Sequence, residues 1–109
     1  GTYVQAWSSP DALAQCNTTA TAASPPVKHM LGDPNPNQPS VLWNAMIYPL
    51  LNMRFGGFVW YQGEANAKDA DHYTCMFSAM ISDWRDKFDA TVHDTPFLFV
   101  QLAPYVDSG

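Results

Sequence analysis

Residues 55–66, FGGFVWYQGEAN, decide how this chain is expected to fold. The aromatic and β-branched run Phe58–Tyr61 follows a Gly-Gly break and predicts a short buried strand. Residues 62–66 then turn polar, and a helical pattern begins a few residues later. Strand, polar turn and helix in this order place side chains at the carboxyl end of a strand, where open α/β sheets carry their chemistry. Within that turn stands Glu64, the only glutamate of the chain.

A long amphipathic helix is predicted downstream of this turn, over residues 69–89 with Asp69 as its cap. Its apolar stripe, at helical spacing, consists of Tyr73, Met76, Phe77, Met80, Ile81, Trp84 and Phe88. A second apolar run, Phe97–Leu102, predicts another buried strand, interrupted at Gln101. Two such strands joined through a helix indicate a right-handed βαβ unit of a parallel sheet, and therefore an α/β fold.

Two helical segments are expected before residue 55. Residues 9–11, Ser-Pro-Asp, have the cap, the first-turn proline and the acidic residue of a helix start, so residues 12–16 are predicted to be helical. Residues 40–53 are apolar on almost every side and predict a buried helix capped by Ser40. Pro49 should kink this helix or end its first part near Tyr48.

The stretch between these two segments, residues 17–39, reads as an irregular surface loop. It holds many proline, alanine, threonine, serine and asparagine residues. A loop of this length inside a compact domain is often functional. We interpret its one histidine, His29, as a solvated loop residue.

Composition limits the classes of protein to which the chain can belong. A length of 109 residues suits one small domain, and a hydrophobic content of 47% excludes a disordered chain. The formal charge of −5, from 5 basic and 10 acidic residues, argues against nucleic acid as a partner. No apolar run reaches the length that spans a membrane.

The two cysteines are predicted to form a disulfide. Cys75 lies off the apolar stripe, at about 200° from Tyr73 at 100° per residue, and Cys16 is its only available partner. Asn17 begins an Asn-Thr-Thr glycosylation sequon beside Cys16. Together these features favour a secreted, lysosomal or otherwise luminal location.

Motifs for self-contained catalysis are missing from the sequence. Ser8 and Ser9 are the tempting nucleophiles, with His29, His72 or His93 as a base, but no Gly-x-Ser-x-Gly elbow frames either serine. The histidines and cysteines lack metal-ligand spacing, and no glycine-rich phosphate loop joins a strand to a helix. We therefore expect no metal and no cofactor.

Four segments resemble sialate O-acetylesterases, which belong to the SGNH-type carbohydrate esterases. The resemblance runs in order along nearly the whole chain, with residues 17–39 least alike, and it rests on Gly1–Cys16 (GTYVQAWSSPDALAQC), Ser40–Leu51 (SVLWNAMIYPLL), Val59–Asn66 (VWYQGEAN) and Phe97–Ala103 (FLFVQLA). It implies a flavodoxin-like α/β/α sandwich with a parallel sheet, of which residues 1–109 form one central part, incomplete at both ends. It also implies removal of O-acetyl groups from sialic acids by serine acyl transfer.

The same resemblance implies which part of the site lies in this chain. The family's nucleophilic serine and catalytic histidine belong to flanking segments, before Gly1 and after Gly109, so those segments are expected partners. Residues 1–109 are therefore expected to supply the oxyanion hole and the pocket wall.

The resemblance assigns the oxyanion hole to two loops. Gly1 matches a glycine that supplies an oxyanion-hole amide in the family, and Gln62 and Gly63 match its Q-G-E loop. The general SGNH pattern has an asparagine where this sequence has Ala65. We therefore expect the Gln62 side chain to donate to the oxyanion, with Asn66 as the second choice.

Two further polar residues are candidates for substrate binding. Glu64 either holds its loop by accepting backbone N–H bonds, the favoured interpretation, or binds a sugar hydroxyl. Asn44, in an apolar helix, is either hydrogen-bonded for structural reasons or is a buried amide that orients the site.

Three other interpretations stay open at this stage. An acetylxylan-type carbohydrate esterase shares the Q-G-E loop. The chain could also be a non-catalytic carbohydrate-binding or interaction segment. Without the resemblance, residues 62–64 read equally well as an ordinary strand-to-helix turn.

Overall fold

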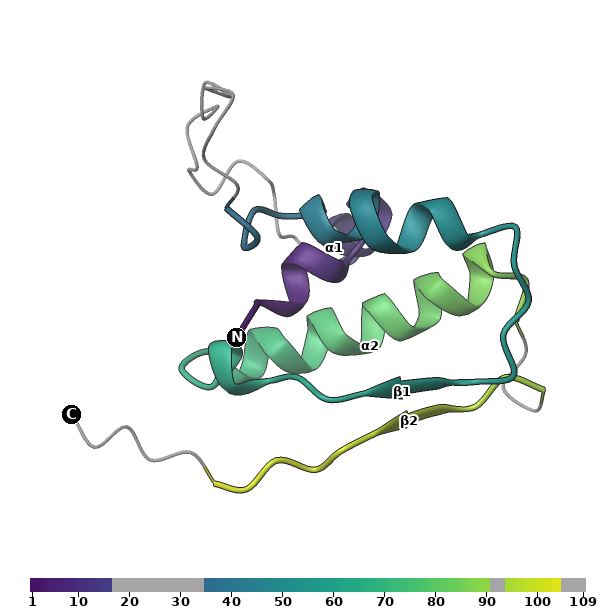
Figure 1. The fold of residues 1–109 in the computed structure, drawn as a ribbon. Helices are drawn as coiled ribbons and strands as arrows, with labels where there is room; N and C mark the ends of the chain where they lie inside the picture. Colours follow the sequence, from purple (N-terminus) through teal and green to yellow (C-terminus); the bar gives the residue numbers. More distant parts are fainter. Residues whose placement is uncertain (17–34, 91–93, 105–109) are drawn as a thin grey trace.

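The structure, a computed structural model, describes residues 1–16, 35–90 and 94–104 (Figure 1). In chain order its elements are η1 (Val4–Trp7), α1 (Pro10–Gln15), η2 (Trp43–Ile47), η3 (Tyr48–Leu50), β1 (Phe58–Trp60), η4 (Glu64–Asn66), α2 (Ala70–Lys87) and β2 (Phe97–Phe99). The sequon at Asn17, both His29 and His93, and most of the predicted loop lie outside the described residues. No helix in the described part is long and apolar enough to cross a membrane.

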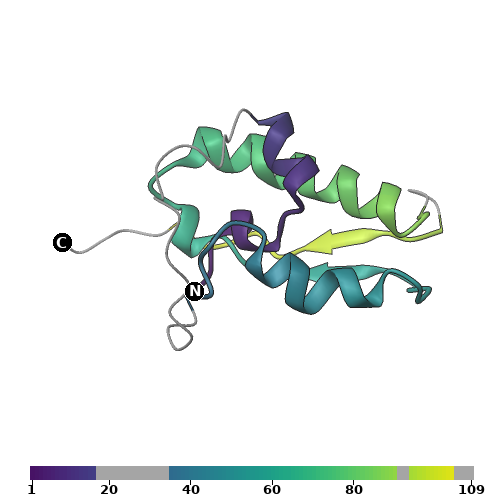
Figure 2. The same cartoon turned by 90° about the horizontal axis from the view of Figure 1, so that it is seen from above.

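The two strands form a parallel pair joined through α2, as the sequence predicts. Phe58 pairs with Phe97, and Trp60 pairs with Phe99. The ladder continues at both ends, where the N–H of Phe58 donates to the carbonyl of Pro96 and the N–H of Val100 donates to that of Trp60. α2 runs alongside both strands in every view (Figures 1 and 2). The α/β class is confirmed, whereas the larger sandwich stays an expectation.

The prediction that both strands are buried is wrong for most of their residues, since only Trp60 is buried and its partner Phe99 is 57% exposed. Trp60 is buried against α2, but Val59, on the opposite face, is 79% exposed and its partner Leu98 is 60% exposed. Successive strand residues point to opposite faces, and the described helices cover only one of them. Tyr61, included in the predicted strand, lies beyond its end and is also exposed.

Residues on two sides of α2 pack against other elements. The predicted stripe is confirmed, since Met76, Met80 and Trp84 are buried and pack with residues of η1, α1, η2 and β1. A second row, Cys75, Ala79 and Asp83, faces α1; the sequence predicted only the contact of Cys75 with Cys16. Asp83 is buried and pairs with Lys87, which also pairs with Asp11 of α1. Asp69 occupies the predicted N-cap position, although its side chain makes no capping hydrogen bond.

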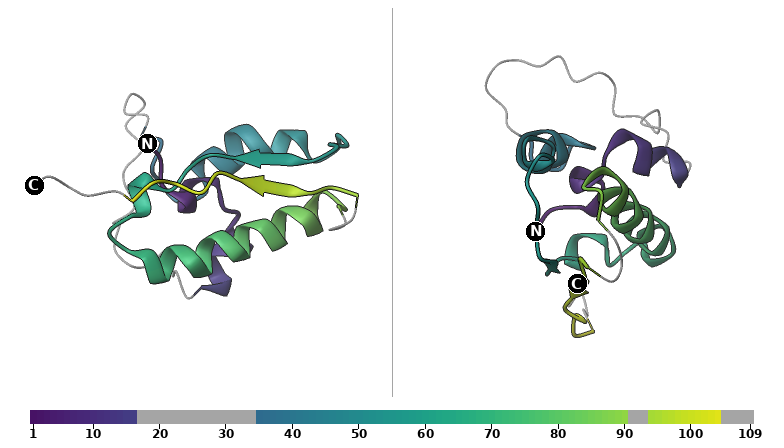
Figure 3. Two further views of the ribbon diagram at one scale, coloured as in Figure 1. Left: turned by 90° about the horizontal axis from the view of Figure 1, so that it is seen from below. Right: turned by 90° about the vertical axis from the view of Figure 1, so that its right-hand side faces the viewer.

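The predicted start of α1 and the predicted disulfide are both confirmed. The Ser9 hydroxyl accepts from the N–H of Ala12 at 3.1 Å, and Pro10 occupies the first helical position. Cys16, just after α1, is bonded to Cys75 of α2, with their Cα atoms 5.9 Å apart. The bond therefore clamps α1 onto the side of α2 that faces away from the sheet (Figure 3).

The burial predicted for the helix over residues 40–53 is wrong. Of its apolar residues only Trp43 is buried, whereas Met46, Tyr48 and Met53 are each more than half exposed. Ser40 directly precedes the helical residues, and its carbonyl accepts from the N–H of Asn44, but it has a φ of 61° and its hydroxyl donates to the carbonyl of Ser8 at 2.8 Å. A long-range bond to η1's end thus outweighs its local capping preference.

The effect expected of Pro49 is confirmed. The five-residue π-helical stretch η2 ends at Ile47, and the 3₁₀ stretch η3 begins at Tyr48. Proline has no N–H to donate to the carbonyl four residues earlier, so a regular α-helix cannot continue through it.

Candidate active site

The loop between β1 and α2 turns sharply at Gly63. This residue has a φ of 153°, and a Cβ built on it would lie 2.8 Å from Leu102 Cδ1 and 3.3 Å from the Tyr73 hydroxyl. Only glycine meets both the conformational and the steric requirement. The turn lets the short helix η4 begin at Glu64, directly after the carboxyl end of β1.

The Gln62 carboxamide is held from three directions. Its Nε2 donates to the Thr2 carbonyl at 2.7 Å and to Asn66 Oδ1 at 2.8 Å. Its Oε1 lies 3.2 Å from the hydroxyl of Tyr73, which can donate to it. The side chain thus leaves the end of β1 toward the segment of Gly1, as expected. Both of its N–H groups already have protein acceptors in this state.

Asn66 joins the loop to the N-terminal segment. Its side chain is almost fully buried, at 4% residue exposure, and its Oδ1 accepts from the N–H of Val4 as well as from Gln62. Its Nδ2 donates to Gln5 Oε1 at 3.0 Å. These bonds across more than 60 residues of sequence make Asn66 a connector between η4 and η1. Its role as the second choice for the oxyanion donor remains a prediction.

Tyr73 approaches the loop from the first turns of α2. Its hydroxyl lies 3.1 Å from the Gln62 carbonyl and 3.2 Å from Gln62 Oε1, and its single proton can serve either acceptor. Burial raises the pKa of Tyr73 above its ordinary value; the nearby Trp60 indole N–H opposes this effect, and the Glu64 carboxylate adds to it. The phenol is therefore protonated, and a donor, at neutral pH.

Of these residues, Gln62 lies on the wall of a small cavity of about 200 Å³. The cavity is lined by Gly1, Thr2, Trp7, Trp60, Tyr61, Gln62 and Glu64. Three aromatic side chains, one amide and one carboxylate therefore converge where β1 ends. Within the described part of the chain, the buried Nε1 of Trp60 lacks a well-aligned hydrogen bond.

The two residues predicted to bind substrate, Glu64 and Asn44, differ in whether they line this cavity. Glu64 is exposed and lines the cavity, and both of its roles, holding the loop or binding a sugar hydroxyl, remain predictions. Asn44 is exposed rather than buried, and it does not line this cavity. A buried amide at position 44 was therefore a wrong expectation, because η2 buries only its Trp43 side.

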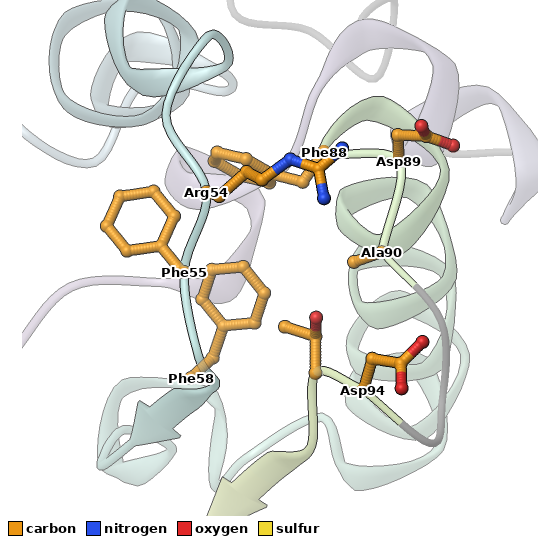
Figure 4. A pocket seen from close by; sticks show the side chains of 8 residues that line it. Arg54, Phe55, Phe58, Phe88, Asp89, Ala90 and Asp94 are labelled. Atoms are coloured by element: carbon orange, nitrogen blue, oxygen red, sulfur yellow. The ribbon is translucent and has the colours of Figure 1, made fainter.

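A second cavity, of about 230 Å³, lies at the opposite, amino-terminal ends of the strands (Figure 4). Its lining residues are Arg54, Phe55, Phe58, Phe88, Asp89, Ala90, Asp94 and Thr95. None of the predicted site residues lies there. The carboxyl end of β1 is therefore the place where the predicted residues meet.

The structure argues against Ser8 and Ser9, the two serines considered as nucleophiles. Ser8 and Ser9 have no exposed surface. The Ser8 hydroxyl donates to the Val4 carbonyl, and that of Ser9 caps α1. No group of three or more histidine, cysteine, aspartate or glutamate side chains in the described part is placed to hold a metal ion.

Sequence reasoning missed Tyr73 and the Thr2 carbonyl as members of the site. Tyr73 was assigned to the core because it lies on the apolar stripe. A tyrosine on such a stripe still carries a hydroxyl that needs a partner, and its place beside the Q-G-E loop was a usable signal. A backbone carbonyl such as that of Thr2 leaves no trace in side-chain patterns.

Comparison with known proteins agrees with the resemblance seen in the motifs. The chain is 40% identical to sialate O-acetylesterase from Mus musculus over an alignment 134 residues long, which covers 97% of this chain and 25% of that protein. It is 44% identical to the sialate O-acetylesterases from Pongo abelii and Homo sapiens over 109 aligned residues, covering 94% of this chain and 20% of each relative. No protein-family model matches the chain.

The chain thus spans 20–25% of the length of these curated relatives. Identity of 40–44% over 94–97% of the chain is far beyond a shared motif. We therefore place this chain in the sialate O-acetylesterase family, as the counterpart of a segment of its members.

Proposed function

We propose that this chain supplies the oxyanion-binding loop and part of the pocket wall of an esterase that removes O-acetyl groups from sialic acids. The observation that carries the proposal is the Gln62 carboxamide, held from three directions at the carboxyl end of β1 and on the wall of a cavity. The named activity of the relatives supports the choice of substrate.

Acyl transfer from an acetyl ester passes through a tetrahedral intermediate with a negative oxygen. Preorganised N–H donors aimed at that oxygen carry much of the catalysis. Gln62 can donate without bearing a charge of its own. In the state described here its N–H groups bond to Thr2 and Asn66. A charged oxyanion is a stronger acceptor than the neutral Thr2 carbonyl and would compete with it for one N–H.

The serine and histidine of this mechanism are proposed to come from flanking segments of the same protein. The cavity itself is lined by no serine, cysteine or histidine of the described residues. The Gly1–Thr2 segment, which Gln62 contacts, would then supply a second donor, the backbone amide at Gly1.

The cavity wall also offers groups that recognise a sugar. The Trp7, Trp60 and Tyr61 rings present faces on which the C–H groups of a sugar pack, and the Glu64 carboxylate accepts from hydroxyl groups. We assign substrate binding to Glu64 on this ground. The Cys16–Cys75 disulfide supports an oxidising compartment, and hence a secreted or lysosomal protein.

The test uses the polypeptide expressed from the complete natural gene. It should release acetate from O-acetylated sialic acids faster than from acetylated xylan, measured by enzymatic acetate assay. Faster release from xylan would point to the acetylxylan-type alternative. Binding of the sugar without acetate release would point to a non-catalytic segment.

In that protein, Gln62→Ala should lower kcat by about 10²–10³-fold, the usual effect of losing one oxyanion donor. KM should change much less, because the interaction strengthens only in the transition state. Asn66→Ala should cost less in kcat than Gln62→Ala. The opposite order, with Gln62→Ala within a few-fold of wild type, would reassign the donor to Asn66.

A further inference from the structure

Tyr73 makes its hydroxyl contacts with a single residue of the loop. Both acceptors within reach of the phenol, the main-chain carbonyl and Oε1, belong to Gln62. The ring itself cannot turn freely, because it stacks on Phe77 with ring centroids 5.5 Å apart and planes 8° from parallel. A fixed donor on the long helix α2 therefore points at a side chain on the loop.

The partners of the Gln62 carboxamide leave only one favourable orientation for it. If the amide turned over, Oε1 would face the Thr2 carbonyl and Asn66 Oδ1, two oxygens at 2.7 and 2.8 Å from the present Nε2. No proton would lie between those oxygens, and Nε2 would face the Tyr73 hydroxyl proton. Acceptors on one side and a donor on the other thus determine which end of the amide faces the Gly1–Thr2 side of the cavity.

Gly63 leaves the room that this contact needs. A Cβ at position 63 would lie 3.3 Å from the Tyr73 hydroxyl oxygen, closer than ordinary van der Waals contact allows. The phenol can therefore approach the loop because Gly63, next to Gln62, has no side chain.

We propose that Tyr73 is a positioning residue of the site, whose hydroxyl sets the orientation of the Gln62 carboxamide so that its N–H side faces the Gly1–Thr2 segment. The inference rests on the proposed function, because it gives Tyr73 a role in acyl transfer through Gln62. Tyr73 does not line the cavity and touches no reacting atom in this role.

The phenol is suited to this role over a wide pH range. Burial, opposed by the Trp60 indole and reinforced by the charge of Glu64, keeps the pKa of Tyr73 above its ordinary value. Ionisation would turn the donor into an acceptor facing Gln62 Oε1, and would favour the overturned amide.

The first test is Tyr73→Phe in the complete protein, with kcat and KM for an O-acetylated sialic acid. Phenylalanine keeps the stacking on Phe77 and removes only the hydroxyl, so the thermal unfolding midpoint should change little. We expect kcat to fall about tenfold, as one modest hydrogen bond implies, with KM within about twofold. Tyr48→Phe is the matched control, since Tyr48 is 62% exposed and remote from the loop; it should leave kcat unchanged.

A double-mutant cycle separates this inference from the proposed function. If Tyr73 acts through Gln62, Tyr73→Phe should change kcat by less than about twofold in a Gln62→Ala background. A Gln62→Ala variant with wild-type kcat would overturn the donor assignment itself. Two outcomes would overturn the positioning role alone, provided that Gln62→Ala lowers kcat as expected. In the first, Tyr73→Phe leaves kcat unchanged. In the second, Tyr73→Phe lowers kcat tenfold both in the wild type and in the Gln62→Ala variant.

A second measurement keeps the inference testable if Tyr73→Phe folds poorly. A fluorinated tyrosine of lower pKa placed at position 73 retains the ring and the hydroxyl. The alkaline decline of kcat should then move to lower pH, because the donor is lost when the phenol ionises. An unshifted pH profile would contradict the proposal.

Discussion

At the scale of single residues, the β1–α2 loop depends most on Gly63. Its φ of 153° is unfavourable for any residue with a Cβ, and the nearest heavy atom to such a Cβ would be Leu102 Cδ1 at 2.8 Å. Gln62 and Asn66, on either side of the turn, bond to each other and to the N-terminal segment. The position of one glycine thus controls how two amide side chains meet.

Gly63→Ala should lower the free energy of unfolding by about 1–3 kcal/mol, the usual cost of a residue held in a sparsely populated conformation. It should also lower kcat in the complete protein, because Tyr73 and Gln62 must move. Urea unfolding monitored by tryptophan fluorescence measures the first effect. Gly56→Ala is the control: a Cβ there meets nothing within 4 Å, and the change should stay within about 0.5 kcal/mol. Equal costs at both positions would contradict this account.

At the scale of elements, α1 and α2 are joined by a disulfide and ion pairs as well as by packing. The Cys16–Cys75 bond links the end of α1 to the second turn of α2, and Lys87 lies between Asp11 and Asp83 near the other end of the contact. α1 has only six residues and would be marginal alone. Its position therefore depends on this clamp and on the burial of Leu13 against the core.

Replacing both Cys16 and Cys75 by serine should lower the free energy of unfolding by about 4 kcal/mol, the value that the chain-entropy model assigns to a loop of this size. The two residues are 59 positions apart in sequence. The measurement is denaturant unfolding with and without a reducing agent. Reduction should destabilise the wild type and leave the double variant unchanged. A wild type that is insensitive to reduction would show that the bond contributes nothing to stability.

At the scale of the whole molecule, the sheet is covered on one face only by the described residues. Val59, Tyr61, Leu98 and Val100 share the other face and are 47–79% exposed. Parallel strands are normally buried on both faces, which explains why the strand residues are apolar throughout. The aromatic cluster between β1, β2 and α2 accounts for the burial that does occur, as in the Trp60–Trp84 contact with centroids 5.7 Å apart.

The 109-residue chain by itself should release no acetate from O-acetylated sialic acids. Among the described residues, no serine or histidine lines the cavity at the end of β1, and the hydroxyls of Ser8 and Ser9 are buried and hydrogen-bonded. The comparison is the purified chain against the complete protein in one acetate assay, with circular dichroism to show that the chain is folded. Acetate release by the chain alone, abolished by Ser8→Ala or Ser9→Ala, would show that the site is misplaced.

The sequence alone determined the local elements and their connection. Periodicity located α2 to within two residues at each end, the Ser-Pro-Asp signal located α1, and the off-stripe position of Cys75 identified the disulfide. These signals are local because helix caps, helical spacing and proline effects act over a few residues. The motif around Gln62 also identified the family.

Only the tertiary structure decided which polar groups meet at the end of β1, and which apolar residues are covered. Asn66 contacts Val4 and Gln5 across some 60 residues, and the Ser40 hydroxyl bonds to Ser8. Tyr73 reads as core in the sequence, yet its hydroxyl reaches Gln62 because the turn at Gly63 brings α2 back beside the strand. Such contacts depend on the path of the chain between distant segments, and no local pattern encodes that path.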